Sequence, residues 1–571
     1  MLRCTANTQL LSPGRYRLGI HPTLPSLRAR QSAWSVPSSA ARSRAEAAVA
    51  APTLPVSATS PSPSQVAPVK TATSIQETSQ SIGGVPRVVL KKGKTAIFRS
   101  GNPMVYSGAV DRVLAKPQPQ PGDTVVVTDG AETPIAWGVF NPHSMFTVRI
   151  MQLQEELGQH HDASLVLNMP QLIAARLHTA IQLRTALGLG INLSQPAATQ
   201  QAKQQQLSDS AVGDTINNHT NGHQIHAGPA DESGVGSTDL SERGGKDHSQ
   251  AVGGEERQRS GRLASTSARA CDVYRVVNSE GDRLSGLIVD RVGDQLVVAS
   301  SAAWVERYRE VITEQLMQAC GTSCRPVWRQ SKEMLKEEGI DVAAADTGAP
   351  EPAAAQVQVQ ENGVRFWVSA STGQKTGFYA DQRDSRLALR HLAQGRAVLD
   401  LCCYTGGFAL NALAGGATHV TGVDSSAPAL ELANSNAQLN GWQPSQYSFL
   451  KDDIMKYMQQ QAAEGALWDL VVLDPPKLAP NRKSLNRALV KYRKLNTLAM
   501  RVVKPGGMLM TCSCSGAVSL DDHFLPMLKE AARVAGRHIS ILRVAGAGPD
   551  HPTDPGYREG LYLKNVLLLV T

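Results

Sequence analysis

Three short segments in the last third of the chain contain residue types that could do chemistry together. They are VLDLCCYTGGFAL (398–410), which contains a glycine pair, VVLDPPK (471–477), which contains an acid before two prolines, and MTCSCSG (510–516), which contains two cysteines. Each has the pattern of a buried strand followed by a loop. Because parallel strands of an open α/β sheet end at one edge, we expect the three segments to form a single site there.

The glycine pair and the acids around it predict a ligand that contains a nucleoside. Glycine lets the backbone approach a ligand at the start of the next helix. Asp424, seventeen residues after Gly407, ends the second strand and could hold ribose hydroxyls. The GxGxxG fingerprint of dinucleotide sites is absent, which favours S-adenosylmethionine over NAD. The predicted cofactor-binding residues are Asp400, Tyr404, Thr405, Gly406, Gly407, Asp424, Asp453 and Asp474.

Asp453 follows the third strand and could accept a hydrogen bond from the adenine amino group. Asp452, its neighbour, is an equally good candidate from the sequence alone. For Asp424 and Asp453 a purely structural role as helix caps is the alternative.

The acid and the thiol of the second and third segments predict chemistry on a pyrimidine. The prolines after Asp474 stop the strand and fix a loop in which the acid can face a flat ring. Cys512 and Cys514 alternate onto one face of their strand, and Cys514 is nearer the exposed end. Carbon 5 of cytosine becomes nucleophilic once a thiolate adds to carbon 6.

The predicted catalytic residues are therefore Cys514, as nucleophile, and Asp474, at ring nitrogen 3. The alternative for Cys514 is a small buried core residue. The sequence assigns no residue to the loss of the proton from carbon 5.

Two basic runs predict a nucleic-acid partner. The segment 477–494 has seven basic residues and no acid, and four of its cations fall on one helical face after the DPPK loop. A second run, 87–99, opens the N-terminal globular region. A solvated charged face is the alternative. The predicted RNA-binding residues are Lys91, Lys92, Lys94, Lys483, Arg487, Lys491 and Lys494.

The net charge of the 571-residue chain, +8, is not by itself a sign of nucleic-acid binding. Residues 1–45 contain seven arginines and no acid, and the remainder has 50 basic and 49 acidic residues. An arginine- and serine-rich, acid-free start is typical of an organelle transit peptide, here for the chloroplast or alternatively the mitochondrion. The chain contains no run of eighteen apolar residues, so the sequence predicts no membrane span. The eight cysteines do not have the spacing of a zinc site.

The pattern of strands, helices and polar tracts predicts a multidomain protein. A small β-barrel is followed by a central α+β domain with a disordered polar insert, and then by an α/β domain with a doubly wound sheet and an antiparallel end. The expected segments are the transit peptide and linker (1–84), the barrel (85–155), the central domain (160–193 and 269–362), the insert (194–268) and the α/β domain (363–571).

From residue 87 to the end, apart from the insert, the chain resembles the RlmI type of ribosomal RNA large-subunit cytosine-5 methyltransferases. The resemblance rests on SGAV (107–110), GDRLSGLIVDR (281–291), KTGFYADQRDSR (375–386), CCYTGGFAL, VDSS, DPPK, SCSG, DHP (550–552) and EGLYLK (559–564).

This resemblance implies a PUA-like barrel, a central α+β domain and a class I, Rossmann-like methyltransferase domain that uses S-adenosylmethionine. It also implies that Cys514 is the nucleophile. Cys403 departs from the family, which often has serine there. The expected pocket residues are Lys375, Thr376, Tyr379, Gln382, Arg383, Pro475 and Lys477.

The sequence therefore predicts an organellar enzyme that forms 5-methylcytosine in large-subunit ribosomal RNA. The expected partner is that RNA, with no membrane and no metal, and a homodimer is left open. Two alternatives remain. One is a guanine-N methyltransferase, because such enzymes share the DPP loop, and the other is a non-catalytic RNA-binding factor in ribosome assembly.

Overall fold

The computed structural model describes residues 74–157, 163–189, 271–321, 324–341, 356–370 and 376–571. The insert expected at 194–268, most of the N-terminal segment and Lys375 lie outside these residues.

The first described element is a helix within the range expected to be linker. It is α1 (Ile75–Ile82), and it begins because Ser74 and Glu77 form a reciprocal capping box. Ile75 is fully buried in a hydrophobic cluster. The expected linker up to residue 84 is therefore wrong at residues 75–82, where the capping box and the buried Ile75 stabilise a helix.

The barrel forms where the short β-rich segments predicted it. Its six-stranded sheet has the order β2-β6-β5-β4-β1-β3, and its core is a separate cluster of alternating apolar side chains. The elements are β1 (Arg87–Leu90), α2 (Thr95–Arg99), β2 (Met104–Tyr106), β3 (Val110–Leu114), β4 (Thr124–Thr128), β5 (Pro134–Phe140) and β6 (Phe146–Leu153).

The central domain is a four-stranded sheet, β10-β9-β8-β7, with helices against it. The chain reaches it through α3, passes through the undescribed insert and returns at β7. Its elements are α3 (Met169–Ala186), β7 (Val273–Asn278), β8 (Leu287–Val292), β9 (Gln295–Ser300), α5 (Ala303–Arg307), α6 (Arg309–Cys320), β10 (Arg325–Gln330) and α7 (Lys332–Glu337).

The C-terminal domain contains a seven-stranded sheet in the order β15-β14-β13-β16-β17-β19-β18. The strands are parallel except β19, which runs antiparallel to both β17 and β18. The predicted doubly wound sheet with an antiparallel end is confirmed. Its strands are β13 (Ala397–Leu401), β14 (His419–Asp424), β15 (Tyr447–Lys451), β16 (Trp468–Leu473), β17 (Val503–Ser513), β18 (Ile539–Ala545) and β19 (Lys564–Val570).

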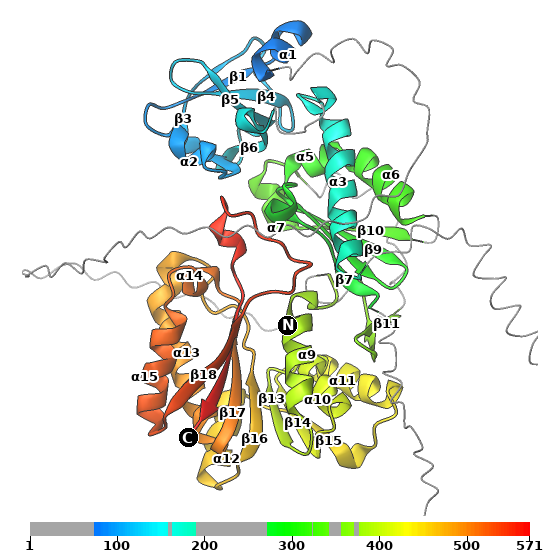
Figure 1. The fold of residues 1–571 in the computed structure, drawn as a ribbon, viewed down its shortest axis with the longest axis vertical. Helices are drawn as coiled ribbons and strands as arrows, with labels where there is room; N and C mark the ends of the chain where they lie inside the picture. Colours follow the sequence, from blue (N-terminus) through cyan, green and yellow to red (C-terminus); the bar gives the residue numbers. More distant parts are fainter. Residues whose placement is uncertain (1–73, 158–162, 190–270, 322–323, 342–355, 371–375) are drawn as a thin grey trace, which may run out of the picture. The chain divides into compact units, whose positions relative to one another are not determined.

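Helices cover both faces of this sheet. Val398 and Leu470 belong to a buried cluster with α9, α10 and α11, whereas Leu399 and Val471 belong to another with α12, α13 and α15. Figure 1 shows the two helix groups on opposite sides of the strands. Buried on both faces, the central strands are almost continuously apolar. The helices are α9 (Arg383–Leu392), α10 (Gly407–Ala414), α11 (Ala427–Leu439), α12 (Ile454–Ala463), α13 (Leu485–Arg501) and α15 (Phe524–Ala535).

The boundary expected between residues 362 and 363 is misplaced, because it cuts a hairpin. Strands β11 (Val357–Glu361) and β12 (Val364–Val368) pair antiparallel. The two residues between them, Asn362 and Gly363, both have positive φ, as a tight hairpin turn requires. Both strands pack into the cluster under α9 and α10, so the last domain begins at β11.

Candidate active site

One cavity of about 700 Å³ lies at the carboxyl edge of the seven-stranded sheet, where the sequence predicts the site. Its wall comes from the ends of β13, β14, β16 and β17, from the start of α12, from the segment before α9 and from the end of the β18–β19 connection. The predicted residues on this wall are Tyr379, Gln382, Tyr404, Thr405, Gly407, Asp424, Asp453, Asp474, Pro475, Lys477, Lys491 and Cys514.

The glycine pair has the geometry that its position requires. Gly406 has φ 85°, in the left-handed region, and caps α10. It is not on the cavity wall. A Cβ on Gly407, which is on the wall, would lie 3.3 Å from Cδ of Arg386, so a side chain at this position would crowd the arginine beside it.

Asp424 holds the loop that faces it. One carboxylate oxygen accepts from the backbone N–H of Tyr404 and the other from that of Ser426, each at 2.9 Å. These two hydrogen bonds fix the loop at the rim of the cavity. The Asp424 carboxylate lies at the end of β14, a position from which a carboxylate can bind ribose hydroxyls.

Asp400 was predicted to contact the cofactor, but the structure does not place it on the wall. It is fully buried under the glycine loop, where its carboxylate accepts from the N–H of Ala409 at 2.9 Å. Burial raises the pKa of Asp400 to about 8. The strand direction takes this side chain inward, so its effect on a ligand acts through the loop that it holds.

Asp453 and Asp452 both line the cavity. Asp453 is also the N-cap of α12 and accepts from the N–H groups of Met455 and Lys456. The capping role considered from the sequence is therefore real, and it leaves the residue on the cavity wall.

A buried ion pair that the sequence did not reveal supports the glycine loop. Arg386 donates to both carboxylate oxygens of Glu361 at 2.7 and 2.6 Å and to the carbonyl of Tyr379 at 2.9 Å. Arg386 lines the cavity next to Gly407. The only sequence signal was its place inside the KTGFYADQRDSR motif, since its partner lies in the hairpin before it.

The other side of the cavity brings the acid and the thiol together. The thiol of Cys514 lies 3.8 Å from the carbonyl oxygen of Pro475, and the side-chain amide of Gln382 donates to Asp474 at 3.2 Å. Cys512, by contrast, is fully buried and accepts from Asn565 at 3.1 Å. Burial raises the pKa of the Cys512 thiol well above its usual range. Of these two cysteines, only Cys514 lies on the cavity wall.

Two expected pocket residues, Thr376 and Arg383, lie behind the wall. Thr376 donates to Asp290 of β8, and the Arg383 guanidinium lies 3.0 Å from a carboxylate oxygen of Asp550. They belong to a buried polar network rather than to the pocket, because the turn before α9 directs their side chains toward the central domain.

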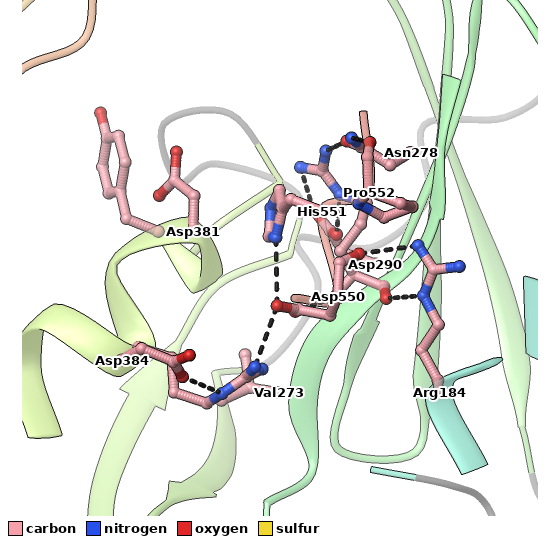
Figure 2. Close-up of polar contacts among 12 residues, drawn as sticks. Arg184, Val273, Asn278, Asp290, Asp381, Asp384, Asp550, His551 and Pro552 are labelled. Atoms are coloured by element: carbon pink, nitrogen blue, oxygen red, sulfur yellow. Dashed lines mark hydrogen bonds and ion pairs between the residues drawn. The ribbon is translucent and has the colours of Figure 1, made fainter. Parts of the chain in front are cut away.

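This network attaches the β18–β19 connection to the central domain. The carboxylate of Asp550 accepts from the backbone N–H of Arg275 at 3.0 Å, and its carbonyl accepts from Arg184 at 2.7 Å. Asn278 donates to the carbonyl of Pro552 at 2.8 Å. Figure 2 shows Asp550 and Pro552 among these partners. The DHP motif therefore has a structural explanation, as it anchors a segment that ends on the cavity wall.

Burial opposes the charged form of Asp550, yet its surroundings favour it. His551 lies 3.2 Å from its carboxylate and Arg383 at 3.0 Å. Together with the N–H of Arg275, they hold the pKa of Asp550 well below its usual range. The anchor is thus a buried carboxylate held as an anion.

The predicted basic residues have different positions. Lys477 and Lys491 line the cavity, whereas Lys483, Arg487 and Lys494 are exposed outside it. Lys483 lies in the short turn before α13, so it is not on the helical face expected for it. In the barrel, Lys91, Lys92 and Lys94 are exposed in the connection after β1.

Two arginines of the basic segment 477–494 form ion pairs with acids from later parts of the chain. Arg482 lies 3.8 Å from Asp521, and Arg493 lies 4.0 Å from Glu530. Within the described ranges, none of the four predicted cations of this segment forms an ion pair.

Among the described helices, none is long and apolar enough to cross a membrane. The described side chains also contain no group of three or more acids, cysteines or histidines that could hold a metal ion.

The fold is that of a methyltransferase. A family model for S-adenosylmethionine-dependent methyltransferases matches residues 315–562, and a model for PUA-like domains matches 88–153. The fold resembles a crystal structure of a methyltransferase complexed with SAH, with TM-score 0.55 and 15% identity over 85% of this chain and 99% of that one. A methyltransferase from Streptococcus mutans gives TM-score 0.54 at 14% identity, with the same coverage of both chains. The protein is therefore an S-adenosylmethionine-dependent methyltransferase with a PUA-like domain.

The sequence relatives define the family. Ribosomal RNA large subunit methyltransferase I of Erwinia tasmaniensis is 32% identical over 480 residues, which are 84% of this chain and 98% of that protein. The protein of the same name from Klebsiella pneumoniae is 38% identical over 293 residues, 51% of this chain and 72% of that one. The chain belongs to the ribosomal RNA large subunit methyltransferase I family.

The residues present fit the cofactor of this class. Asp424 offers a carboxylate at the end of β14, Gly407 leaves its backbone open, and Phe408 and Ile454 supply apolar wall. These residues, with Asp453, would hold S-adenosylmethionine, which supplies an electrophilic methyl group when bound.

Proposed function

We propose that the protein methylates carbon 5 of a cytosine in large-subunit ribosomal RNA, with Cys514 as the nucleophile. The observation that carries the proposal is the contact between the thiol of Cys514 and the carbonyl of Pro475 at 3.8 Å. It joins a half-buried thiol to the DPPK loop on the wall of the cavity that fits the cofactor. Methylation of a ring nitrogen would need no thiol there.

The two catalytic groups divide the work. The Cys514 thiolate adds to carbon 6, which makes carbon 5 electron-rich. Asp474, oriented by the amide of Gln382, stabilises the proton or positive charge at ring nitrogen 3. Carbon 5 then takes the methyl group.

Two observations support RNA as the substrate. Lys477 and Lys491 place cations on the cavity wall, where they can bind phosphates around a base turned out of its stack. The relatives from Erwinia tasmaniensis and Klebsiella pneumoniae are named for large-subunit ribosomal RNA.

We also propose an organellar location, preferably the chloroplast. It rests on the seven arginines and the lack of acids in residues 1–45. A fusion of residues 1–84 to a fluorescent protein should enter plastids. Mitochondrial import would favour the alternative organelle, and diffuse fluorescence would contradict an organellar location.

The full-length protein should be incubated with organellar total RNA and S-adenosylmethionine labelled in the methyl group, and the RNA digested to nucleosides. We expect label in 5-methylcytidine, lost in Cys514→Ala. Cys271→Ala, which removes a half-buried thiol of the central domain, is the matched control and should retain activity. Label in a guanosine would favour guanine-N methylation. No label, together with a failure to bind S-adenosylmethionine, would favour a non-catalytic RNA-binding factor.

A further inference from the structure

The proposed reaction leaves one step without a residue. After carbon 5 has taken the methyl group it still bears its hydrogen, and Cys514 is still bonded to carbon 6. Release of the product requires a group that accepts this proton. We propose that Tyr562, supported by Asp381, accepts the proton from carbon 5; this inference rests on the proposed function.

The two side chains form a hydrogen-bonded pair on the cavity wall. The Tyr562 hydroxyl donates to a carboxylate oxygen of Asp381 at 2.7 Å, and both residues line the cavity that also contains Cys514. They are 181 residues apart in sequence. A phenol bonded in this way can take a proton on its oxygen while it passes its own to the carboxylate.

The surroundings keep the pair in the required state. Burial raises the pKa of Tyr562 well above its usual range, so the phenol is neutral. Asp381 is only 4% exposed. A neutral phenol next to a carboxylate is a proton relay that needs no bulk water.

Three of the other acids on the wall, Asp424, Asp453 and Asp474, have other roles. Both oxygens of Asp424 accept from backbone N–H groups, Asp453 caps α12, and Asp474 is needed at ring nitrogen 3. Tyr379 packs edge-on against Tyr404 of the glycine loop, with ring centroids 5.5 Å apart. The Asp381–Tyr562 pair therefore fits the vacant role better than these groups.

Tyr562 is held by a hydrogen bond to its own backbone and by the anchoring of the connection that precedes it. Its carbonyl accepts from the hydroxyl of Ser519 at 3.0 Å, close after the Cys514 loop. The connection that carries Tyr562 is tied to the central domain through Asp550 and Pro552. An acceptor held at both ends can meet the reacting carbon without reorganisation.

The step balances in atoms and electrons. The C5–H bond breaks, and its electron pair forms the C5–C6 double bond. The C6–S bond breaks, and its pair returns to Cys514 as the thiolate. The proton moves to the oxygen of Tyr562 as the tyrosine's own proton moves to Asp381.

The test uses the full-length protein and transcripts of organellar large-subunit ribosomal RNA made with cytidine or with 5-fluorocytidine. In 5-fluorocytidine, fluorine replaces the hydrogen on carbon 5 and cannot leave as a cation, so elimination is blocked and the second transcript should trap the wild type covalently through Cys514. With the cytidine transcript, Tyr562→Phe should accumulate a methyl-labelled adduct that survives denaturing gels. Its multiple-turnover rate should fall about 100-fold, while the first methyl transfer stays within about threefold. Asp381→Asn should trap in the same way.

Tyr557→Phe is the matched control, because Tyr557 lies in the same connection but not on the cavity wall, and it should behave as the wild type. Normal turnover of Tyr562→Phe without an adduct would overturn the inference, as would trapping by Tyr379→Phe instead. Loss of the 5-fluorocytidine adduct in Tyr562→Phe would also overturn it, since the residue would then act before release. If the wild type itself forms no adduct with 5-fluorocytidine, it is the proposed function that fails.

Discussion

The two sides of the cavity are built in different ways. On the glycine-loop side, Asp424 binds backbone N–H groups two and twenty residues away, and Asp400 binds one nine residues away. On the DPPK side, Asp474 meets Gln382 across 92 residues, and the thiol of Cys514 meets Pro475 across 39. One side is a local strand-loop-helix unit, and the other is assembled from distant segments.

This difference suggests a division of labour. A local unit keeps its shape through its own backbone hydrogen bonds and suits a cofactor common to a whole class. An assembled surface can change through any of several segments and suits a specific substrate. Substitutions on the two sides should therefore affect different quantities.

The largest effect should come from Asp474→Asn. It removes the carboxylate at ring nitrogen 3, and the rate of methylation should fall about 1000-fold. The affinity for S-adenosylmethionine, measured by calorimetry, should stay within about twofold. A large loss of affinity would instead assign Asp474 to the cofactor side.

Asp550→Ala should be the most damaging change to stability. It removes the buried acid that pairs with Arg383 and leaves that guanidinium only the more exposed Asp384 at 3.3 Å. We expect the free energy of unfolding to fall by about 3 kcal/mol. Denaturant unfolding followed by circular dichroism measures this. Asp521→Ala, which breaks an exposed pair with Arg482 at 3.8 Å, is the control and should cost less than about 1 kcal/mol. If Asp550→Ala lowered the free energy of unfolding no more than Asp521→Ala does, the network around Asp550 would not stabilise the fold.

Asp424→Ala should lower the affinity for S-adenosylmethionine and leave the chemical step intact, the reverse of what Asp474→Asn should do. Loss of a charged hydrogen-bond acceptor should weaken binding of S-adenosylmethionine about 30-fold. At saturating cofactor, trapping on the 5-fluorocytidine transcript should recover to near the wild-type level. A rate that stays low at saturation would show that the two sides are not separable.

Asp400 predicts a pH dependence of stability. Its pKa is about 8 in the folded protein and near 4 in the unfolded chain. Between these values the folded state keeps a proton that the unfolded state has lost, so the free energy of unfolding falls as pH rises from about 4 to about 8. Asp400→Asn keeps the acceptor for Ala409 but cannot ionise. Since each unit of pKa difference is worth about 1.4 kcal/mol, it should be more stable than the wild type at pH 8 by several kcal/mol and at pH 5 by only about 1 kcal/mol. Urea midpoints at both pH values test this, and an unchanged difference would contradict it.

The smallest effects should come from the exposed cations. Lys483→Ala and Arg487→Ala should each weaken RNA binding about threefold and lower the slope of log affinity against log salt by about 0.7 to 0.9. Arg533→Ala removes a cation that is already paired with Glu530 at 2.8 Å and is the control. Filter binding at several salt concentrations measures these slopes. If Lys483→Ala and Arg487→Ala give the same slope as the wild type, the two cations do not contact RNA phosphates.

Much of the fold could be predicted from the sequence because its signals are local. The near-continuous apolar strands, the glycine pair at the start of α10 and the order of elements lead to the observed sheet. The boundary at residue 362 was missed although Asn362 and Gly363 are a hairpin signal. The helix at Ile75 was missed because proline- and serine-rich chain precedes it.

For the site, the sequence determined which segments bind and react, since a strand end, a glycine loop and a thiol are each recognisable within a few residues. Only the tertiary structure decided which side chains face the ligand. It turned Asp400, Thr376 and Arg383 away from the cavity and joined Tyr562 to Asp381. The physical reason is that these outcomes depend on burial and on hydrogen bonds between residues far apart in the chain, which no local pattern contains.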